Sequence, residues 1–145
     1  MGRSILLGVE IHSDNDTVYR AITTKDGLSS FWTPSVVAEP EVGSEATFGF
    51  AGAPVSLRMR VTRLNPGSEV AWSCEGDFPF WLGSTVTWSL SPEAEHGGTR
   101  VLFRHDGLAE EIPDWDLASV AHTWATILDR LKVLAETGHA EPALR

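Results

Sequence analysis

The hydrophobic pattern is most regular near the C-terminal end, where it predicts one long helix from Asp114 to Gly138. Apolar residues recur there every three or four positions, which places them on one stripe of an α-helix. The stripe consists of Leu117, Val120, Ala121, Trp124, Ile127, Leu128, Leu131 and Leu134. We expect Asp114 to cap the start of the helix and Gly138 to end it in a left-handed conformation. Such a stripe must be buried against a broad apolar partner.

Near the N-terminus the pattern predicts one strand followed by two short helices. The strand runs from Ile5 to Ile11, and Ser13–Asp16 supplies oxygens that can cap the helix after it. We expect Gly27 to interrupt this helix and Pro34 to stop the second one, because proline cannot continue a helix.

After Gly43 the period changes from helical to two, which predicts strands. Apolar and polar residues alternate over residues 45–50, 55–62, 69–75, 80–90 and 101–105. The clusters Asn65-Pro66-Gly67 and His96-Gly97-Gly98 mark turns between strands. Strands that follow one another across short turns favour an antiparallel meander.

These elements together predict an α+β fold. We expect a curved antiparallel sheet of about six to seven strands wrapped around one long C-terminal helix, with two short helices after the first strand. Residues 1–138 are expected to form a single domain, and residues 139–145 a flexible tail. This arrangement is similar to the helix-grip fold of the START-like (SRPBCC) superfamily.

Two local motifs resemble the heat-shock-90 ATPase activator-like family within that superfamily. The first is Val18-Tyr19-Arg20-Ala21-Ile22-Thr23, followed by Leu28 and Phe31-Trp32. The second is His122-Thr123-Trp124, followed by Ile127, Leu128 and Leu131. Tyr19 stands where the family has Trp, and Thr123 stands where it has Gly. The resemblance implies an apolar pocket between sheet and helix, and a co-chaperone-like interaction is implied by the family name.

Composition and charge narrow the classes of function. The 145 residues are 42% hydrophobic, enough for a sizeable core, and the net charge is −9. A surface this acidic is repelled by nucleic acid and by anionic membranes, so we expect neither as a partner. Cys74 is the only cysteine, which excludes an intramolecular disulfide and fits a reducing compartment. The apolar run at the N-terminus is too short for a signal peptide, and we therefore expect a cytoplasmic protein.

Catalytic and metal-binding motifs are not visible in the sequence. It contains no glycine-rich phosphate loop and no G-x-S-x-G elbow, and Ser84 falls inside a strand pattern. Cys74 alternates with Trp72 on an apolar face, so we expect a buried, inert thiol. The five histidines are scattered without the spacing of a zinc site. We expect no metal and no cofactor, and the sequence leans against an enzyme without deciding the point.

The six tryptophans favour plain core packing slightly over the alternative, which is that they line a cavity. Large aromatic side chains with few polar groups line many small-molecule cavities. His105 is the best polar candidate, either as a satisfied core residue or as a group that orients a ligand. The predicted ligand-binding residues are Phe48, Phe50, Met59, Trp72, Cys74, Trp88, Phe103, His105, Trp124 and Leu128.

Three functions remain open from the sequence. The first is binding of a hydrophobic or aromatic small molecule in a cavity between the sheet and the C-terminal helix. The second is an enzyme of the polyketide cyclase/aromatase type, which the resemblance implies would use the same cavity. The third is a co-chaperone-like protein-interaction domain. A homodimer or a contact with a chaperone stays open as the assembly.

Overall fold

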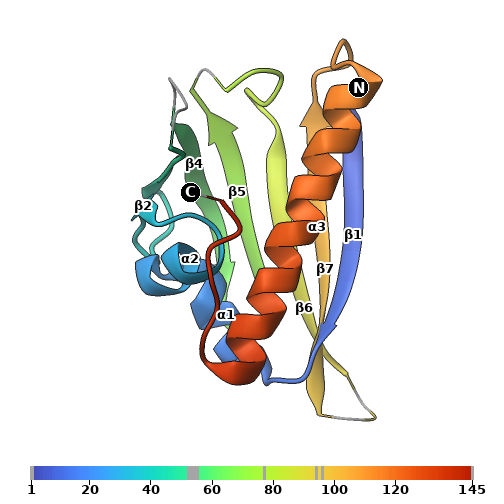
Figure 1. Ribbon diagram of the computed structural model, residues 1–145. Helices are drawn as coiled ribbons and strands as arrows, with labels where there is room; N and C mark the ends of the chain where they lie inside the picture. Colours follow the sequence, from blue (N-terminus) through green and yellow to red (C-terminus); the bar gives the residue numbers. More distant parts are fainter. Residues whose placement is uncertain (1, 52–55, 77, 94, 96, 145) are drawn as a thin grey trace.

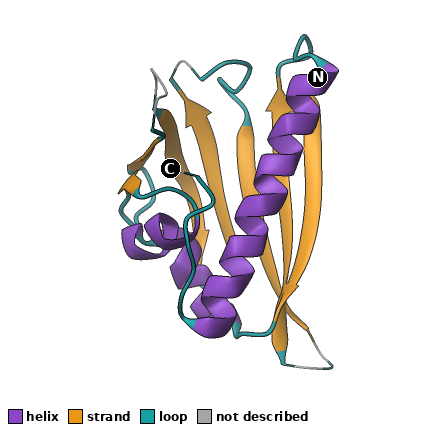
Figure 2. Ribbon diagram, viewed as in Figure 1, coloured by secondary structure: helices purple, strands orange, loops and turns teal. Residues whose placement is uncertain are grey.

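A seven-stranded antiparallel sheet carries helices on one of its faces (Figures 1 and 2). The computed structural model describes residues 2–51, 56–76, 78–93, 95 and 97–144. In chain order the elements are β1 (Arg3–Ile11), α1 (Asn15–Thr23), α2 (Lys25–Phe31), β2 (Ser35–Val37), β3 (Glu45–Gly49), β4 (Leu57–Asn65), β5 (Glu69–Glu75), β6 (Thr85–Glu93), β7 (Gly98–Leu108) and α3 (Asp114–Thr137). The strand order β1-β7-β6-β5-β4-β3-β2 makes β1 and β2 the two edges. The predicted helix-grip architecture is confirmed.

The long helix α3 crosses the concave face of the sheet diagonally (Figure 1). The middle of its stripe is fully buried, at Trp124, Ile127, Leu128 and Leu131. Gly138 ends the helix in the left-handed region, with φ 80°, as predicted. The predicted cap at Asp114 is wrong: Pro113 occupies the cap position without a side-chain hydrogen bond. The Asp114 carboxylate instead accepts a hydrogen bond from Arg3 at 2.9 Å, which ties α3 to β1.

Helices α1 and α2 are separated at Thr24 rather than at Gly27 as predicted. The Thr24 hydroxyl caps α2 by accepting a hydrogen bond from the Gly27 N–H at 3.1 Å. Gly27 lies inside α2, where a Cβ atom would clash with the backbone of Ala21 in α1. The glycine is therefore explained by the close approach of two helices and not by a helix break.

The sheet differs from the predicted strands in two places. Strand β6 begins at Thr85 rather than at residue 80, because residues 79–83 form turns in which Phe80 (φ 69°) and Gly83 (φ 82°) are left-handed. The side chains of Phe80 and Leu82 are exposed, so their alternation was accidental. The three-residue strand β2 was too short to predict. The start of the predicted strand 55–62, at Val55, lies outside the described residues, as does His96 of one predicted turn.

Where the sequence predicted a flexible tail, the structure places the end of the C-terminal segment, at Ala143 and Leu144, against the end of α2 (Figure 1). The backbone N–H groups of Ala143 and Leu144 donate to the carbonyls of Phe31 and Trp32 at 3.0 and 2.8 Å. These carbonyls lie at the end of α2, where a helix leaves such groups without an intrahelical partner. The segment therefore completes the C-terminal end of a helix that lies more than one hundred residues earlier in the chain.

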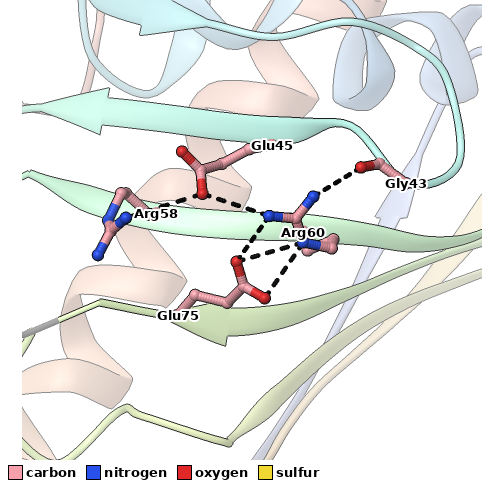
Figure 3. Close-up of polar contacts among 5 residues, drawn as sticks. All are labelled: Gly43, Glu45, Arg58, Arg60 and Glu75. Atoms are coloured by element: carbon pink, nitrogen blue, oxygen red, sulfur yellow. Dashed lines mark hydrogen bonds and ion pairs between the residues drawn. The ribbon is translucent and has the colours of Figure 1, made fainter.

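A charged network on the outer face of the sheet joins three strands (Figure 3). Arg60 of β4 donates to the Glu75 carboxylate of β5 at 3.1–3.3 Å and to the Gly43 carbonyl at 2.7 Å. Glu45 of β3 lies 3.6 Å from Arg60 and 3.9 Å from Arg58. The hydrogen bonds from Arg60 hold the pKa of the Glu75 carboxyl below its usual range. Because the network is exposed, it favours the strand register more than it adds stability.

We predict that Leu131→Ala lowers the free energy of unfolding by about 2–5 kcal/mol, because it removes a fully buried side chain between α3 and the sheet. Urea denaturation followed by circular dichroism measures the change. Val133→Ala is the matched control on the same helix, since Val133 is 44% exposed and should change stability by no more than about 0.5 kcal/mol. Equal effects of the two substitutions would contradict this packing of α3.

Candidate functional site

A cavity of about 340 Å³ lies between α3 and the β3–β4 half of the sheet. Its wall is almost entirely apolar and contains five aromatic rings. The lining residues are Trp32, Phe50, Leu57, Phe78, Trp81, Ser119, Val120, Thr123, Trp124, Ile127 and Leu144. Only Ser119 and Thr123 bring polar side chains, and both belong to α3. The chemistry of the wall therefore suits a largely apolar guest.

Three of the five aromatic side chains are brought to the cavity by different local features. Trp32 is the residue that ends α2, and Phe50 directly follows β3. Trp81 comes from the turn between β5 and β6, where the left-handed conformation of Phe80 leaves Phe80 exposed and turns Trp81 inward. The Phe80 carbonyl accepts a hydrogen bond from the Ala109 N–H at 3.0 Å, which fixes this turn against the end of β7.

Leu144 completes the cavity wall from the C-terminal segment. Its backbone N–H is bound to the carbonyl of Trp32, so a lining residue of the segment is tied directly to a lining residue of α2. The preceding part of the segment is held by Arg130 of α3, which donates to the Glu141 carbonyl at 3.2 Å. The wall thus joins residues from both ends of the sequence.

Trp124 is the centre of the aromatic packing beside the cavity. Its ring centroid lies 4.4 Å from that of Phe103, 5.0 Å from Trp32, 5.9 Å from Trp81 and 6.1 Å from Trp88. Most of these pairs are tilted or edge-to-face, the arrangements that aromatic quadrupoles favour. One face of the cluster belongs to the cavity and the other to the core of the sheet.

A chain of hydrogen bonds runs through the buried polar groups of this cluster. The Trp124 Nε1–H donates to His105 Nδ1 at 3.1 Å, so Nδ1 carries the lone pair and the proton of the neutral ring is on Nε2. That Nε2–H donates to Ser84 Oγ at 2.9 Å, and the Ser84 hydroxyl donates to the Trp81 carbonyl at 2.6 Å. Every donor in the chain has an acceptor, and the direction of the chain fixes the tautomer of His105.

Burial in this cluster leaves the His105 ring and the Cys74 thiol uncharged at neutral pH, so that neither is reactive. Burial lowers the pKa of His105 to about 4, although nearby Asp106 opposes the shift, so the ring is neutral at pH 7. Because Nε2 donates to Ser84, it has no lone pair with which to take the proton of that hydroxyl, as activation of a serine nucleophile requires. Burial raises the pKa of the Cys74 thiol to about 11. The prediction that Cys74 is a buried, weakly ionised thiol agrees with this environment.

The cavity coincides only in part with the ligand-binding residues predicted from the sequence. Of the ten predicted ligand-binding residues, two line it, Phe50 and Trp124. The other eight are buried side by side in the core: Phe48, Met59, Trp72, Cys74, Trp88, Phe103, His105 and Leu128. Strand alternation identified the inward face correctly, but it does not distinguish the filled part of that face from the hollow part.

Several lining residues were not among those predicted. Trp32 sits at a helix end and Trp81 and Phe78 lie near a turn, where no alternation marks the inward direction. The sequence marks Thr123 only as a departure from the family motif. Leu144 lies in the segment predicted to be a flexible tail.

Within the described part of the chain, no three His, Cys, Asp or Glu side chains lie close enough to hold a metal ion, and no helix is long and apolar enough to span a membrane.

Comparisons with known proteins give one consistent result. The profile of the family described as "Activator of Hsp90 ATPase homolog 1-like protein" matches residues 13–136. No curated protein matches the chain. Among solved structures, the chain is similar to the Aha1 dimer from Colwellia psychrerythraea, with 31% identity and a TM-score of 0.81, over 94% of this chain and 98% of that one.

Two more distant structures show the fold alone. Protein MLL2253 from Mesorhizobium loti is 20% identical, with a TM-score of 0.75 over 91% of this chain and 96% of that one. DynU16, from the dynemicin biosynthetic locus, is 21% identical, with a TM-score of 0.76 over 98% of this chain and 49% of that one. The resemblance inferred from the two local motifs is confirmed by the family match and by the structure that is 31% identical.

We predict that His105 makes the protein less stable in acid. The pKa of this ring is about 4 when folded and near 6.5 when unfolded, so the unfolded state binds the proton first. Stability is therefore unaffected above about pH 6.5 and falls as the pH drops toward 4. Between pH 7 and pH 5 the loss should be about 2 kcal/mol larger in the wild type than in His105→Gln. Urea denaturation at the two pH values measures it, and an equal loss in both proteins would contradict a buried neutral ring.

Proposed function

The chain belongs to the family of Activator of Hsp90 ATPase homolog 1-like proteins and adopts the helix-grip fold, and from this premise we propose a function. We propose that the protein binds a hydrophobic or aromatic small molecule in the cavity beside α3. The observation that carries this proposal is the wall of the cavity. Five aromatic rings and four aliphatic side chains surround a space of about 340 Å³. Ligand pockets typically begin at about 300 Å³ and are lined in this way.

The cavity is better suited to binding than to catalysis. Its described lining residues include no titratable side chain, and besides the indole N–H groups of its tryptophans the polar side-chain groups are the hydroxyls of Ser119 and Thr123. The Thr123 hydroxyl donates to the Ser119 carbonyl at 2.9 Å within the helix. His105, whose ring packs against the lining residues Trp81 and Trp124, is engaged at both ring nitrogens. A cyclase-type reaction needs a group that moves protons at the substrate, and the wall offers none.

We predict that a neutral apolar fluorescent probe binds the folded protein with micromolar affinity and quenches tryptophan emission. Val120→Trp should weaken binding at least about tenfold, because Val120 lines the cavity and the larger ring fills it. The matched control is Val133→Trp on the same helix, since Val133 is exposed and absent from the lining. Its affinity should equal that of the wild type.

Native mass spectrometry of the freshly purified protein tests the same proposal independently, through a co-purified apolar molecule. Binding that survives Val120→Trp would place the probe elsewhere on the protein. Absence of probe binding to the wild type would mean that the cavity is packing space only. Retention of the protein on immobilised Hsp90 with an empty cavity would favour the co-chaperone alternative instead.

We further propose that two copies of the chain associate through β1, as a relative described as a dimer is 31% identical. β1 is a nine-residue edge strand without proline, and its middle carries no charge from Ser4 to Val9. Exposed edges of this kind pair readily with other strands. Lys132 donates to the Glu10 carbonyl at 2.7 Å, so the backbone groups of Glu10, and by alternation of Gly8 and Leu6, point away from β7.

The outer face near this edge is self-complementary. Leu6 is 55% exposed and Leu102 45% exposed, while Gly8 lies opposite Leu102 in the β1–β7 ladder. A shallow hollow lies over Gly8, bordered by Ser91, Arg100 and Leu102. Antiparallel pairing of β1 with its copy about Leu7 places each Leu6 over the hollow of the other protomer. The Glu10–Arg100 pair at 3.1 Å keeps the local charge balanced there.

We predict that the wild type sediments as a dimer at tens of micromolar, and that Leu6→Lys shifts it to monomer because a charged edge resists strand pairing. Val37→Lys, on the opposite edge strand β2, is the matched control, since Val37 is 65% exposed. Analytical ultracentrifugation measures both. A monomeric wild type would exclude the dimer, and a dimeric Leu6→Lys would exclude β1 as its interface.

A further inference from the structure

Two neighbouring hydroxyl groups of α3 give the cavity wall its polar side. Ser119 and Thr123 both line the cavity and lie one helical turn apart. The other described lining side chains are apolar except for indole N–H groups, and an indole nitrogen donates hydrogen bonds but does not accept them. Among the described lining side chains, a hydrogen-bond acceptor is therefore found at these two positions alone.

Both hydroxyls lie on an accessible side of the helix. Ser119 is exposed and Thr123 is partly exposed, in contrast to the buried indole of Trp124 in the next position. Ser119 and Thr123 lie on the same side of α3 as Arg130, which reaches the C-terminal segment whose Leu144 lines the cavity (Figure 1). Ser119 also borders a second hollow, on the outside of α3, so it lies where the cavity meets solvent.

The hydrogen bonds within the helix leave the two hydroxyls with complementary capacities. The Thr123 hydroxyl donates to the Ser119 carbonyl at 2.9 Å, so its proton is engaged and its oxygen is left to accept. The Ser119 hydroxyl makes no hydrogen bond among the described residues and is left to donate. Side chains four positions apart on a helix have Cβ atoms about 5–6 Å apart. One hydroxyl group can bridge such a gap with a hydrogen bond of about 2.8 Å on each side.

Resting on the ligand-binding function proposed above, we propose that the guest is a mostly apolar aromatic molecule with one hydroxyl group. This hydroxyl accepts a hydrogen bond from Ser119 and donates one to Thr123. The rings then extend toward Leu57 and Leu144, which offer only apolar contact. In the reverse orientation the guest hydroxyl would lose water without gaining an acceptor side chain, which is unfavourable. The two hydroxyls of α3 therefore select the class of guest and its orientation.

The experiment uses 2-naphthol and 2-methylnaphthalene, two probes of nearly the same size in which a hydroxyl and a methyl group replace each other. Isothermal titration calorimetry measures both dissociation constants, and the readout is their ratio. Ser119→Ala and Thr123→Val should each lower the preference for 2-naphthol by about fivefold, the change expected for one net hydrogen bond. Neither variant removes apolar contact area, so the affinity for 2-methylnaphthalene should stay close to that of the wild type.

Thr126→Val is the matched control on the same helix. The Thr126 hydroxyl donates to the His122 carbonyl at 3.1 Å, the same kind of bond that Thr123 makes to Ser119, but Thr126 does not line the cavity. This variant therefore reproduces any effect of the substitution on the helix itself. Its affinity ratio should equal that of the wild type.

Intermolecular nuclear Overhauser effects give a second readout that does not depend on affinity. The protons of 2-naphthol beside its hydroxyl should contact the Thr123 methyl group, and those of the far ring the methyl groups of Leu57 and Leu144. An unchanged affinity ratio in either variant, an equal change in Thr126→Val, or the reverse orientation of 2-naphthol overturns the hydroxyl inference while leaving apolar binding in place. Failure of both probes to bind the wild type overturns the ligand-binding function itself.

Discussion

The packing of the long helix on the sheet depends on the burial of one indole, that of Trp124, between them. Its ring contacts aromatic residues from the C-terminal cap of α2, from β6, from β7 and from the turn before β6. Its N–H donates to His105, which in turn binds Ser84 at the end of that turn. The turn presents Trp81 to the cavity. The packing of the Trp124 indole therefore affects three features together. It attaches α3 to the sheet, keeps the His105 ring buried and neutral, and shapes the wall of the cavity.

The sequence was sufficient to predict the architecture, because the periodicity of apolar residues shows which face of a helix or strand is buried. The stripe of α3 and the alternation of β4, β5 and β7 each reflect one buried face, and the structure has the corresponding elements. The predictions were wrong at residues whose local sequence pattern is compatible with two different backbone conformations. Gly27 looks like a helix break but permits a close helix contact, and Phe80 alternates like a strand residue but turns in the left-handed region. Only the surrounding fold separates these meanings.

The candidate site was less accessible to prediction for a different reason. The pattern of apolar residues shows which side chains face inward. It does not show whether other side chains fill the space in front of them or leave a cavity there. Trp72 and Trp124 have equally good inward signals, yet the first is covered by Trp32 and Phe48 while the second borders open space. Leu144 closes that space from a segment whose placement depends on the end of α2. Such a contact has no signature in its own neighbourhood of the chain.

The pairing of β1 with β7 also bears on how the protein is made. Ile5 pairs with His105, so the first strand finds its neighbour only after one hundred further residues have been added. At roughly 5–20 residues per second, synthesis of that stretch takes about 5–20 seconds. During this time the apolar side of β1 has no strand partner, while the strands β3 to β6 are made one after another and each can pair with the strand before it. Closing so long a loop is slow compared with forming the helices. The rate of folding is then set by the most distant strand pair, and the newborn chain is most prone to aggregate just before that pair forms.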